Sequence, residues 1–192
     1  FVVYCIYCGL TYFIPFLNKI YMLPATAVGM YGIVNQYGLK MIGGPVGGFM
    51  SDKVHKSAAK HIRVGFVVCI VAMAVFLMIP HEALGQKGMW MLGAVCTLTF
   101  GAIVFTMRAV FFAPMDEVKV PREITGAAMS MASLIIYLPN TFAYVMYGNF
   151  LDRFPGMTGF RIVFSVMIGW AVVGVGVSTF LIRRIKKHQK NA

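Results

Sequence analysis

Apolar segments about as long as a bilayer core is thick recur along the chain, separated by short polar loops. A helix needs ~20 apolar residues, rising about 1.5 Å each, to cross that core. We therefore predict an all-α membrane protein with six transmembrane helices. They span about residues 1–17, 25–50, 63–80, 88–113, 123–150 and 159–182.

Composition favours the same class. The chain is 59% hydrophobic and 12% charged, whereas soluble domains average roughly 45–50% apolar and about 25% charged residues. The net charge of +11 could indicate a nucleic-acid partner. The cations lie beside the apolar runs, however, with no polar domain to carry such a binding face. We expect the lipid bilayer to be the surrounding medium, and no nucleic acid to bind.

The distribution of Lys and Arg predicts the orientation, because such residues are enriched in cytoplasmic loops. The loop at residues 51–63 is densely basic, and so is the tail at residues 183–192. Both ends of the chain are therefore expected in the cytoplasm of a multi-pass protein of a bacterial inner membrane or plasma membrane. The cations on that side are Lys53, Lys56, Lys60, Arg63, Lys119, Arg122, Arg183, Arg184, Lys186, Lys187 and Lys190, against Lys19, Lys87, Arg153 and Arg161 opposite.

A short internal similarity supports this segmentation. The second predicted helix ends in Gly48-Phe49-Met50-Ser51-Asp52-Lys53, and the fifth ends in Gly148-Asn149-Phe150-Leu151-Asp152-Arg153. Both share a Gly-x-x-x-Asp-cation pattern, three helices apart. The predicted topology places the two copies on opposite sides of the membrane. This placement is typical of an inverted three-plus-three repeat, although so few matching positions could also coincide by chance.

Two overlapping G-x-x-x-G pairs precede the basic loop. Gly43 pairs with Gly47 and Gly44 with Gly48, so side chains are missing from one helix face and another backbone can approach closely. Asp52 follows at the membrane boundary, where it can pair with a cation or cap a helix. We predict a close, breakable contact that acts as a conformational switch, with Lys53 as part of it. The alternative is that these glycines only pack helices within the bundle.

The run from Gly43 to Lys56 resembles the signature loop of the major facilitator superfamily, although His55-Lys56-Ser57 replaces the usual basic continuation. This resemblance implies that residues 1–192 are the C-terminal six-helix half of a transporter. Because Phe1 already lies inside an apolar segment, the start is expected to be truncated, with the N-terminal half as partner. The resemblance also implies that the first and fourth helices line a central cavity.

Polar residues at membrane depth are the candidate substrate-binding residues, because burying them in lipid costs several kcal/mol. Lys40 lies near the middle of the second helix, with Gln36 one turn away on the same face. Such a lysine could bind an anionic solute, pair with a carboxylate of the missing half, or be neutral and structural. Arg108 is a further candidate, although it could also extend to the cytoplasmic headgroups.

Three more candidates lie on the first and fifth helices. Tyr4 and Thr11 fall close to one face of the first helix, and ordinary aromatic packing is the alternative for that face. Asn140 follows Pro139, which should bend the fifth helix near mid-membrane and free backbone carbonyls.

The sequence shows little that would indicate an enzyme. The histidines lie in loops or the tail, and the four cysteines, Cys5, Cys8, Cys69 and Cys96, fall in apolar runs as small buried groups. We expect no enzyme activity, metal or cofactor. The leading hypothesis is a secondary active transporter that moves a small solute, preferably an organic anion such as a sugar acid or organophosphate, by alternating access. Transport would be coupled to a proton or another ion, as in symport. The alternatives are a membrane scaffold or assembly subunit, and a half-carrier that dimerises with itself.

Overall fold

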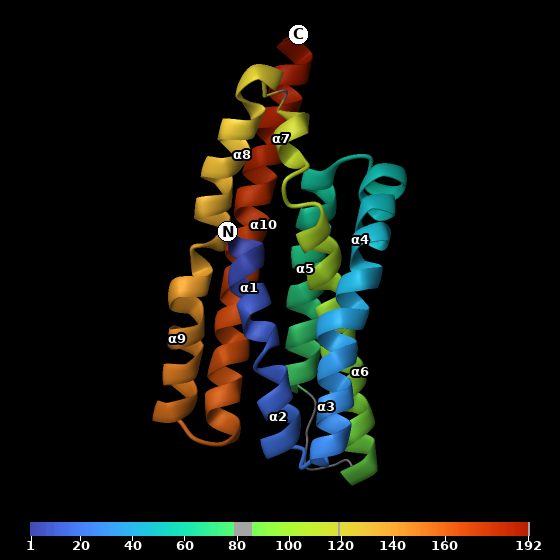
Figure 1. The fold of residues 1–192 in the computed structure, drawn as a ribbon, viewed down its shortest axis with the longest axis vertical. Coiled ribbons are helices and arrows are strands. Elements are labelled where there is room, and N and C mark those ends of the chain that lie inside the picture. Colours follow the sequence, from blue (N-terminus) through green and yellow to red (C-terminus); the bar gives the residue numbers. More distant parts are fainter. Residues whose placement is uncertain (79–85, 119, 192) are drawn as a thin grey trace.

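The computed structural model describes residues 1–78, 86–118 and 120–191, and in these ranges all regular structure is helical. Figure 1 shows the helices side by side in one elongated bundle. The elements are α1 (Val2–Leu10), α2 (Phe13–Lys19), α3 (Ala25–Ile33), the π-helical η1 (Val34–Gly38), α4 (Leu39–Phe49), the π-helical η2 (Met50–His55), α5 (Ala58–Met78), α6 (Gln86–Ala109), α7 (Pro114–Glu117), α8 (Arg122–Tyr137), α9 (Pro139–Arg153) and α10 (Met157–Asn191).

Within the described ranges, five helical stretches are long and apolar enough to cross a membrane. They are Val2–Lys19, Ala58–Met78, Trp90–Ala109, Glu123–Arg153 and Met157–Lys187. The all-α membrane class is thereby confirmed. The predicted second span is also helical, from α3 through η2, but it does not reach the same apolarity. Its glycines, with Asn35, Gln36 and Lys40, account for the difference. We call residues 25–55 the polar rod.

Several helix ends differ from the prediction. The first helix continues to Lys19 with Pro15 inside it, and it is interrupted one turn earlier, at Thr11 and Tyr12. Proline has no N–H to bond the carbonyl four residues before it, which explains this position of the break. The basic tail is no separate segment, because α10 runs on to Asn191. Residues 79 and 80, Lys119 and the side chains of Lys87, Arg122 and Lys190 lie outside the described residues.

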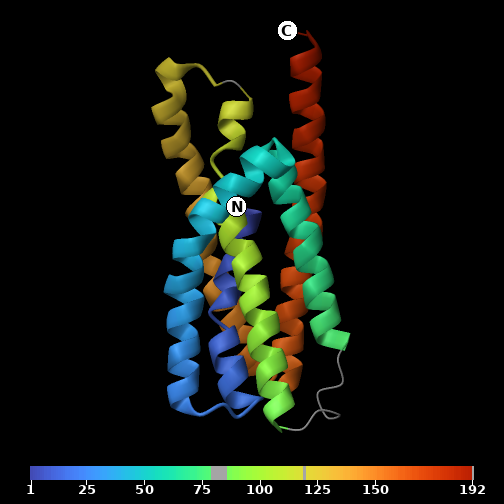
Figure 2. The ribbon, with the colours of Figure 1, turned by 90° about the vertical axis from the view of Figure 1, so that its right-hand side faces the viewer.

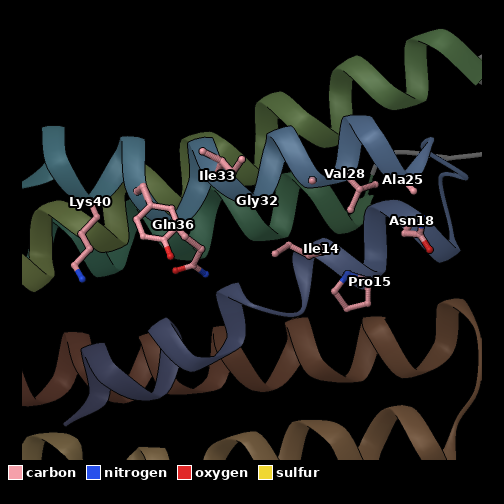
Figure 3. Close-up of a pocket in the computed structure, with 11 residues that line it drawn as sticks. Ile14, Pro15, Asn18, Ala25, Val28, Gly32, Ile33, Gln36 and Lys40 are labelled. Carbon is pink, nitrogen blue, oxygen red and sulfur yellow. The ribbon is translucent and has the colours of Figure 1, made fainter.

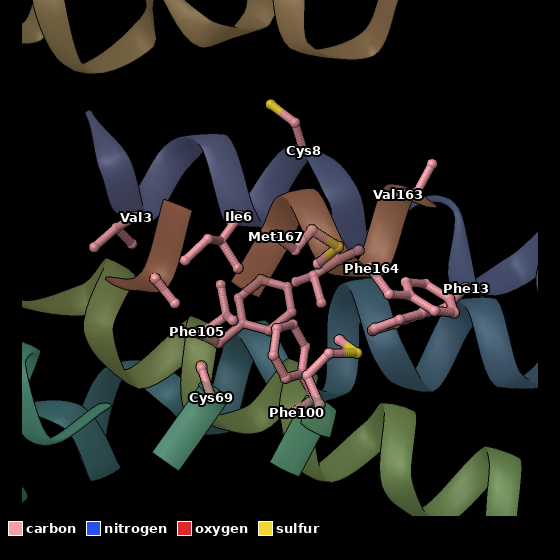
Figure 4. Close-up of a cluster of buried hydrophobic side chains, with 14 of the residues drawn as sticks. Val3, Ile6, Cys8, Phe13, Cys69, Phe100, Phe105, Val163, Phe164 and Met167 are labelled. Atoms are coloured by element: carbon pink, nitrogen blue, oxygen red, sulfur yellow. The ribbon is translucent and has the colours of Figure 1, made fainter. Parts of the chain in front are cut away.

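Aromatic and aliphatic side chains from α1, α2, α5, α6 and α10 form most of the core, and α3 and α9 add a few more. Phe16 and Phe164 are fully buried, and their rings lie 5.2 Å apart. Figure 4 shows part of this cluster, with Ile6 of α1 and Met167 of α10 pointing toward the same group of buried side chains. Gly9 makes room for the thioether of Met167, because a β-carbon there would lie 2.5 Å from the sulfur. Helix α1 is therefore held closely against α10.

The polar rod packs along α6 through one of the two glycine pairs. A β-carbon at Gly43 would lie 2.8 Å from Phe105, and one at Gly47 would lie 2.5 Å from the backbone oxygen of Thr106. Gly44 and Gly48 face open space, with nothing within 4 Å of the same position. One pair therefore packs helices within the bundle, as the simpler alternative proposed, and the other pair has no neighbour in the described chain.

Different loops lie at the two ends of the bundle (Figures 1 and 2). One end holds η2, α7, the start of α8 and the C-terminus, while the turns after α2 and α9 lie at the other end. The two copies of the Gly-x-x-x-Asp-cation pattern thus lie at opposite ends. An inverted relation between the two halves of the chain stays a prediction.

Candidate functional site

Arg108 lies beneath two tyrosine rings of α1. Its guanidinium carbon is 4.1 Å from the ring centre of Tyr7 and 5.4 Å from that of Tyr4. The Nη1 atom is buried and has no hydrogen-bond partner among the described residues. Cation–π contacts stabilise a desolvated guanidinium, but they leave its N–H donors unsatisfied. The Arg108 guanidinium thus packs against α1, and its N–H donors could bind an anion.

Asn140 joins this cluster from the break between α8 and α9. Its amide donates to the Tyr4 hydroxyl over 3.4 Å, and the Cys8 thiol donates to its carbonyl oxygen over 3.6 Å. The ring of Tyr137 meets that of Tyr4 edge-on at 4.9 Å. Pro139 starts α9 and interrupts α8, as predicted. This polar cluster of Tyr4, Tyr7, Arg108 and Asn140 brings together three of the predicted residues.

Thr11 serves a local purpose in this structure. Its hydroxyl donates to the carbonyl of Cys8, 2.9 Å away on the same helix. Tyr12, the next residue, donates its hydroxyl to the backbone of Tyr144 on α9 over 2.7 Å. Both bonds lie at the interruption between α1 and α2, where they help to satisfy backbone carbonyls. Thr11 therefore lies near the polar cluster without contacting Arg108 or Asn140.

Lys40 and Gln36 line a groove between the polar rod and α2. The groove has a volume of about 830 Å³, and Ile14, Pro15 and Asn18 of α2 form its other wall. Figure 3 shows Lys40 and Gln36 projecting from the rod on the same side as α2. Lys40 is exposed on the surface of the rod. The two residues share a face of the rod, as their spacing predicts.

The groove and the polar cluster are close in height along the bundle. Gly43 is level with Phe105, and Tyr7 contacts that phenylalanine with ring centres 5.8 Å apart. Lys40 lies three residues before Gly43, and Arg108 three residues after Phe105. The rod and α6 run in the same direction (Figure 1). The two cations are therefore about 9 Å apart along the axis, at 1.5 Å per residue.

A second polar feature, around Asn35, was not predicted from the sequence. Asn35 is fully buried in η1, and neither its amide nitrogen nor its amide oxygen has a hydrogen-bond partner in the described chain. Gly101 of α6 makes room for it, because a β-carbon there would lie 2.7 Å from the Asn35 oxygen. The side chain of Tyr31, one turn away, is also buried. The i, i+4 spacing of Tyr31 and Asn35 was the signal that could have revealed them.

Around the predicted switch motif, the closest contacts come from another residue. Asp52 and Lys53 are exposed. Glu117 of α7 instead binds the start of α5, where its carboxylate accepts hydrogen bonds from the Ala58 N–H and, over 2.9 Å, from the Ser57 hydroxyl. A carboxylate at a helix N-terminus satisfies free N–H groups and is favoured by the helix dipole. Glu117 thus connects α7 to the start of α5.

Comparisons with known proteins place the chain among membrane proteins. It is 50% identical to inner membrane protein YihN of Escherichia coli (strain K12), over 99% of this chain and 44% of that protein. It is 28% identical to inner membrane protein YqcE of the same organism, over 94% of this chain and 41% of that protein. The chain thus spans less than half the length of these relatives. It is a multi-pass helical protein of an inner membrane.

The same comparisons correct the resemblance to the major facilitator superfamily. The relatives are named only as inner membrane proteins. No family model matches the chain, and no solved structure matches it. The Gly-rich run before a basic loop was the only motif behind that resemblance. Such a run also arises wherever two helices pack closely, which is the role that Gly43 and Gly47 have here.

Proposed function

We propose that the chain forms one helical bundle of a membrane carrier for small organic anions, working by alternating access and coupled to an ion gradient. The observation that carries the proposal is the buried Nη1 atom of Arg108, which has no partner among the described residues. A buried cation without a carboxylate favours an anion from outside the bundle. Tyr4 and Asn140 add hydrogen-bonding groups beside it.

In this proposal, Lys40 supplies a second positive charge to the solute site. Lys40 lies at the groove, with an offset from Arg108 of about 9 Å along the axis, at 1.5 Å per residue, so a solute would have to reach from the polar cluster into the groove to contact both cations. Gln36 would offer an amide to its hydroxyl or carbonyl groups. Apolar walls from Ile14 and Val28 limit the water around these contacts. An organic anion with a polar body fits this combination better than an apolar solute does.

The polar rod would be a sixth span. Its residues 25–55 measure about 46 Å at 1.5 Å per residue, longer than a bilayer core. They pack along α6 through Gly43 and Gly47. Gln36 and Lys40, which line the groove, would then face the solute path, not lipid. The second bundle needed to close the cavity would come from the remainder of a longer protein, such as the relatives contain.

Binding measurements on the complete carrier test the proposal. Gluconate and glycerol 3-phosphate serve as probes, read out by thermal stabilisation and by uptake into proteoliposomes. Arg108→Lys should retain part of the binding, whereas Arg108→Gln should lose it at least tenfold. Arg183→Gln, a cation on the far end of α10, is the matched control and should bind as the wild type does. Unchanged uptake by Arg108→Gln would refute the proposal.

A second series examines Lys40. If its charge contributes, Lys40→Arg retains affinity while Lys40→Gln and Lys40→Ala both lose it. Equal affinity of Lys40→Gln and the wild type would remove Lys40 from the site while leaving Arg108 in it.

A further inference from the structure

A pocket at one end of the bundle gathers three lysines from three segments. Lys56 follows η2, Lys60 lies in the first turn of α5, and Lys186 lies near the end of α10. With Ser57, Glu117, Ile182 and Ile185, they line a cavity of about 150 Å³. Water occupies about 30 Å³ per molecule in the liquid, so the cavity has room for a phosphate group. We call it the lysine pocket.

The single carboxylate in the pocket only partly offsets the charge of these lysines. Both oxygens of Glu117 accept hydrogen bonds from the start of α5, one from the Ala58 N–H and one from the Ser57 hydroxyl. None of the three ammonium groups forms an ion pair within the described residues. The lysine pocket therefore holds three positive charges against one negative charge.

The backbone at Lys56 holds this arrangement at a conformational cost. Lys56 has φ 52° and ψ 26°, the left-handed conformation in which a helix C-terminus usually carries glycine. A lysine there is uncommon and costs about 1 kcal/mol or more relative to the right-handed form. The turn brings the Lys56 side chain to the pocket wall. Because this conformation is costly for lysine, its presence at Lys56 favours a functional role for the side chain.

The position of the pocket indicates where its ligand comes from. Helix α5 begins at Ala58, and the apolar run of α10 ends at Ile182, directly before Arg183 and Arg184, so the pocket lies at the boundary of the apolar part of the bundle. Ile182 and Ile185 are buried against Ala59 and form an apolar floor beside the charges. At this depth the phosphates of membrane lipids are the abundant anions, and basic pockets between helices bind them.

We propose that the lysine pocket binds the phosphate of an anionic phospholipid headgroup. Lysine ammonium groups suit this ligand, because they act as mobile point charges and do not require the planar geometry of an arginine pair. The acyl chains would leave along the apolar side of α5 and α10. The proposal is independent of transport, since none of its residues lies in the groove or the polar cluster.

The test compares lipids and charge-matched variants. The purified protein, in phosphatidylcholine nanodiscs, is titrated with phosphatidylglycerol and, separately, with inorganic phosphate, and bound lipid is counted by native mass spectrometry. The pocket variant combines Lys56→Gln, Lys60→Gln and Lys186→Gln. The control variant combines Arg183→Gln, Arg184→Gln and Lys187→Gln, which are exposed cations of α10 outside the pocket. Both variants lose three positive charges.

We expect the pocket variant to lose phosphatidylglycerol binding at least tenfold and the control to change less than threefold. A variant with arginine at all three pocket positions should retain binding, which separates loss of charge from loss of folding. Equal losses in the pocket and control variants would mean diffuse attraction to the surface, and this outcome would overturn the proposal. Binding of inorganic phosphate as tight as that of phosphatidylglycerol would overturn the lipid assignment.

Discussion

Replacing Gly47 by alanine should destabilise the bundle, whereas the same change at Gly48 should not. A β-carbon at Gly47 would lie 2.5 Å from the backbone oxygen of Thr106 and 3.2 Å from the β-carbon of Ala109. Since ordinary contact begins at 3.4 Å, the polar rod and α6 would have to separate by close to 0.9 Å. The obstacle at Thr106 is backbone, so no side-chain rotation can relieve it.

The magnitude follows from two terms. Overpacking of this kind costs about 1–3 kcal/mol. Replacing a helical glycine by alanine also gains up to about 1 kcal/mol of helix propensity. That gain is common to Gly47→Ala and Gly48→Ala, because both positions are helical. The difference in the free energy of unfolding between the two variants should therefore be about 1–3 kcal/mol, all from the contact with α6.

Thermal unfolding of the purified protein in detergent measures this difference. For a chain of this size, 1 kcal/mol shifts Tm by about 2–4 °C, so Gly47→Ala should melt at least 2 °C below Gly48→Ala. Gly44→Ala, also without neighbours within 4 Å, should behave as Gly48→Ala does. Equal melting temperatures for Gly47→Ala and Gly48→Ala would refute the conclusion that Gly43 and Gly47 pack against α6 while Gly44 and Gly48 do not.

Three further predictions address the end of the bundle that holds η2. Val54→Cys should resist an impermeant thiol reagent in intact cells, because the basic loop is expected in the cytoplasm; labelling from outside would reverse the topology. Glu117→Ala should lower the free energy of unfolding by about 0.5–2 kcal/mol through loss of the α5 cap, whereas the exposed Asp116→Ala should have little effect, and equal melting temperatures would contradict the cap. Asp52→Asn should alter the turnover of the carrier more than its equilibrium affinity for substrate, and a collapse of affinity with normal conformational exchange would disprove a switch role.

The hydrophobic pattern predicted the helices well but not their irregularities. The first helix was predicted as unbroken over about residues 1–17, although Pro15 lies within that range. In the structure Phe16 and Leu17 are fully buried after it, and their packing keeps the chain helical to Lys19. Burial of this kind depends on α5, α6 and α10, which lie far away in the sequence. Local rules therefore did not predict the break at Thr11 and Tyr12, one turn before Pro15.

The candidate site was predictable in its residues and not in its arrangement. Counting residues along the chain identified Lys40 and Arg108 as cations at membrane depth. Whether Arg108 turns toward headgroups or beneath the rings of Tyr4 and Tyr7 depends on how α1 packs against α6. Likewise, two overlapping glycine pairs look equivalent in sequence, and only the position of α6 distinguishes Gly47 from Gly48.

The interruptions described above divide the bundle mechanically. Helices α5, α6 and α10 run without a break and pack side by side as a stiff frame. The other three long stretches are each interrupted: at Thr11 and Tyr12, along η1, and between α8 and α9 at Leu138. Prolines and π-helical segments are where helices bend most readily. The Cys8–Asn140 contact joins the first and third of these flexible points. Two of the three interruptions, at Thr11 and at Leu138, therefore meet on the side of the bundle that carries the polar cluster.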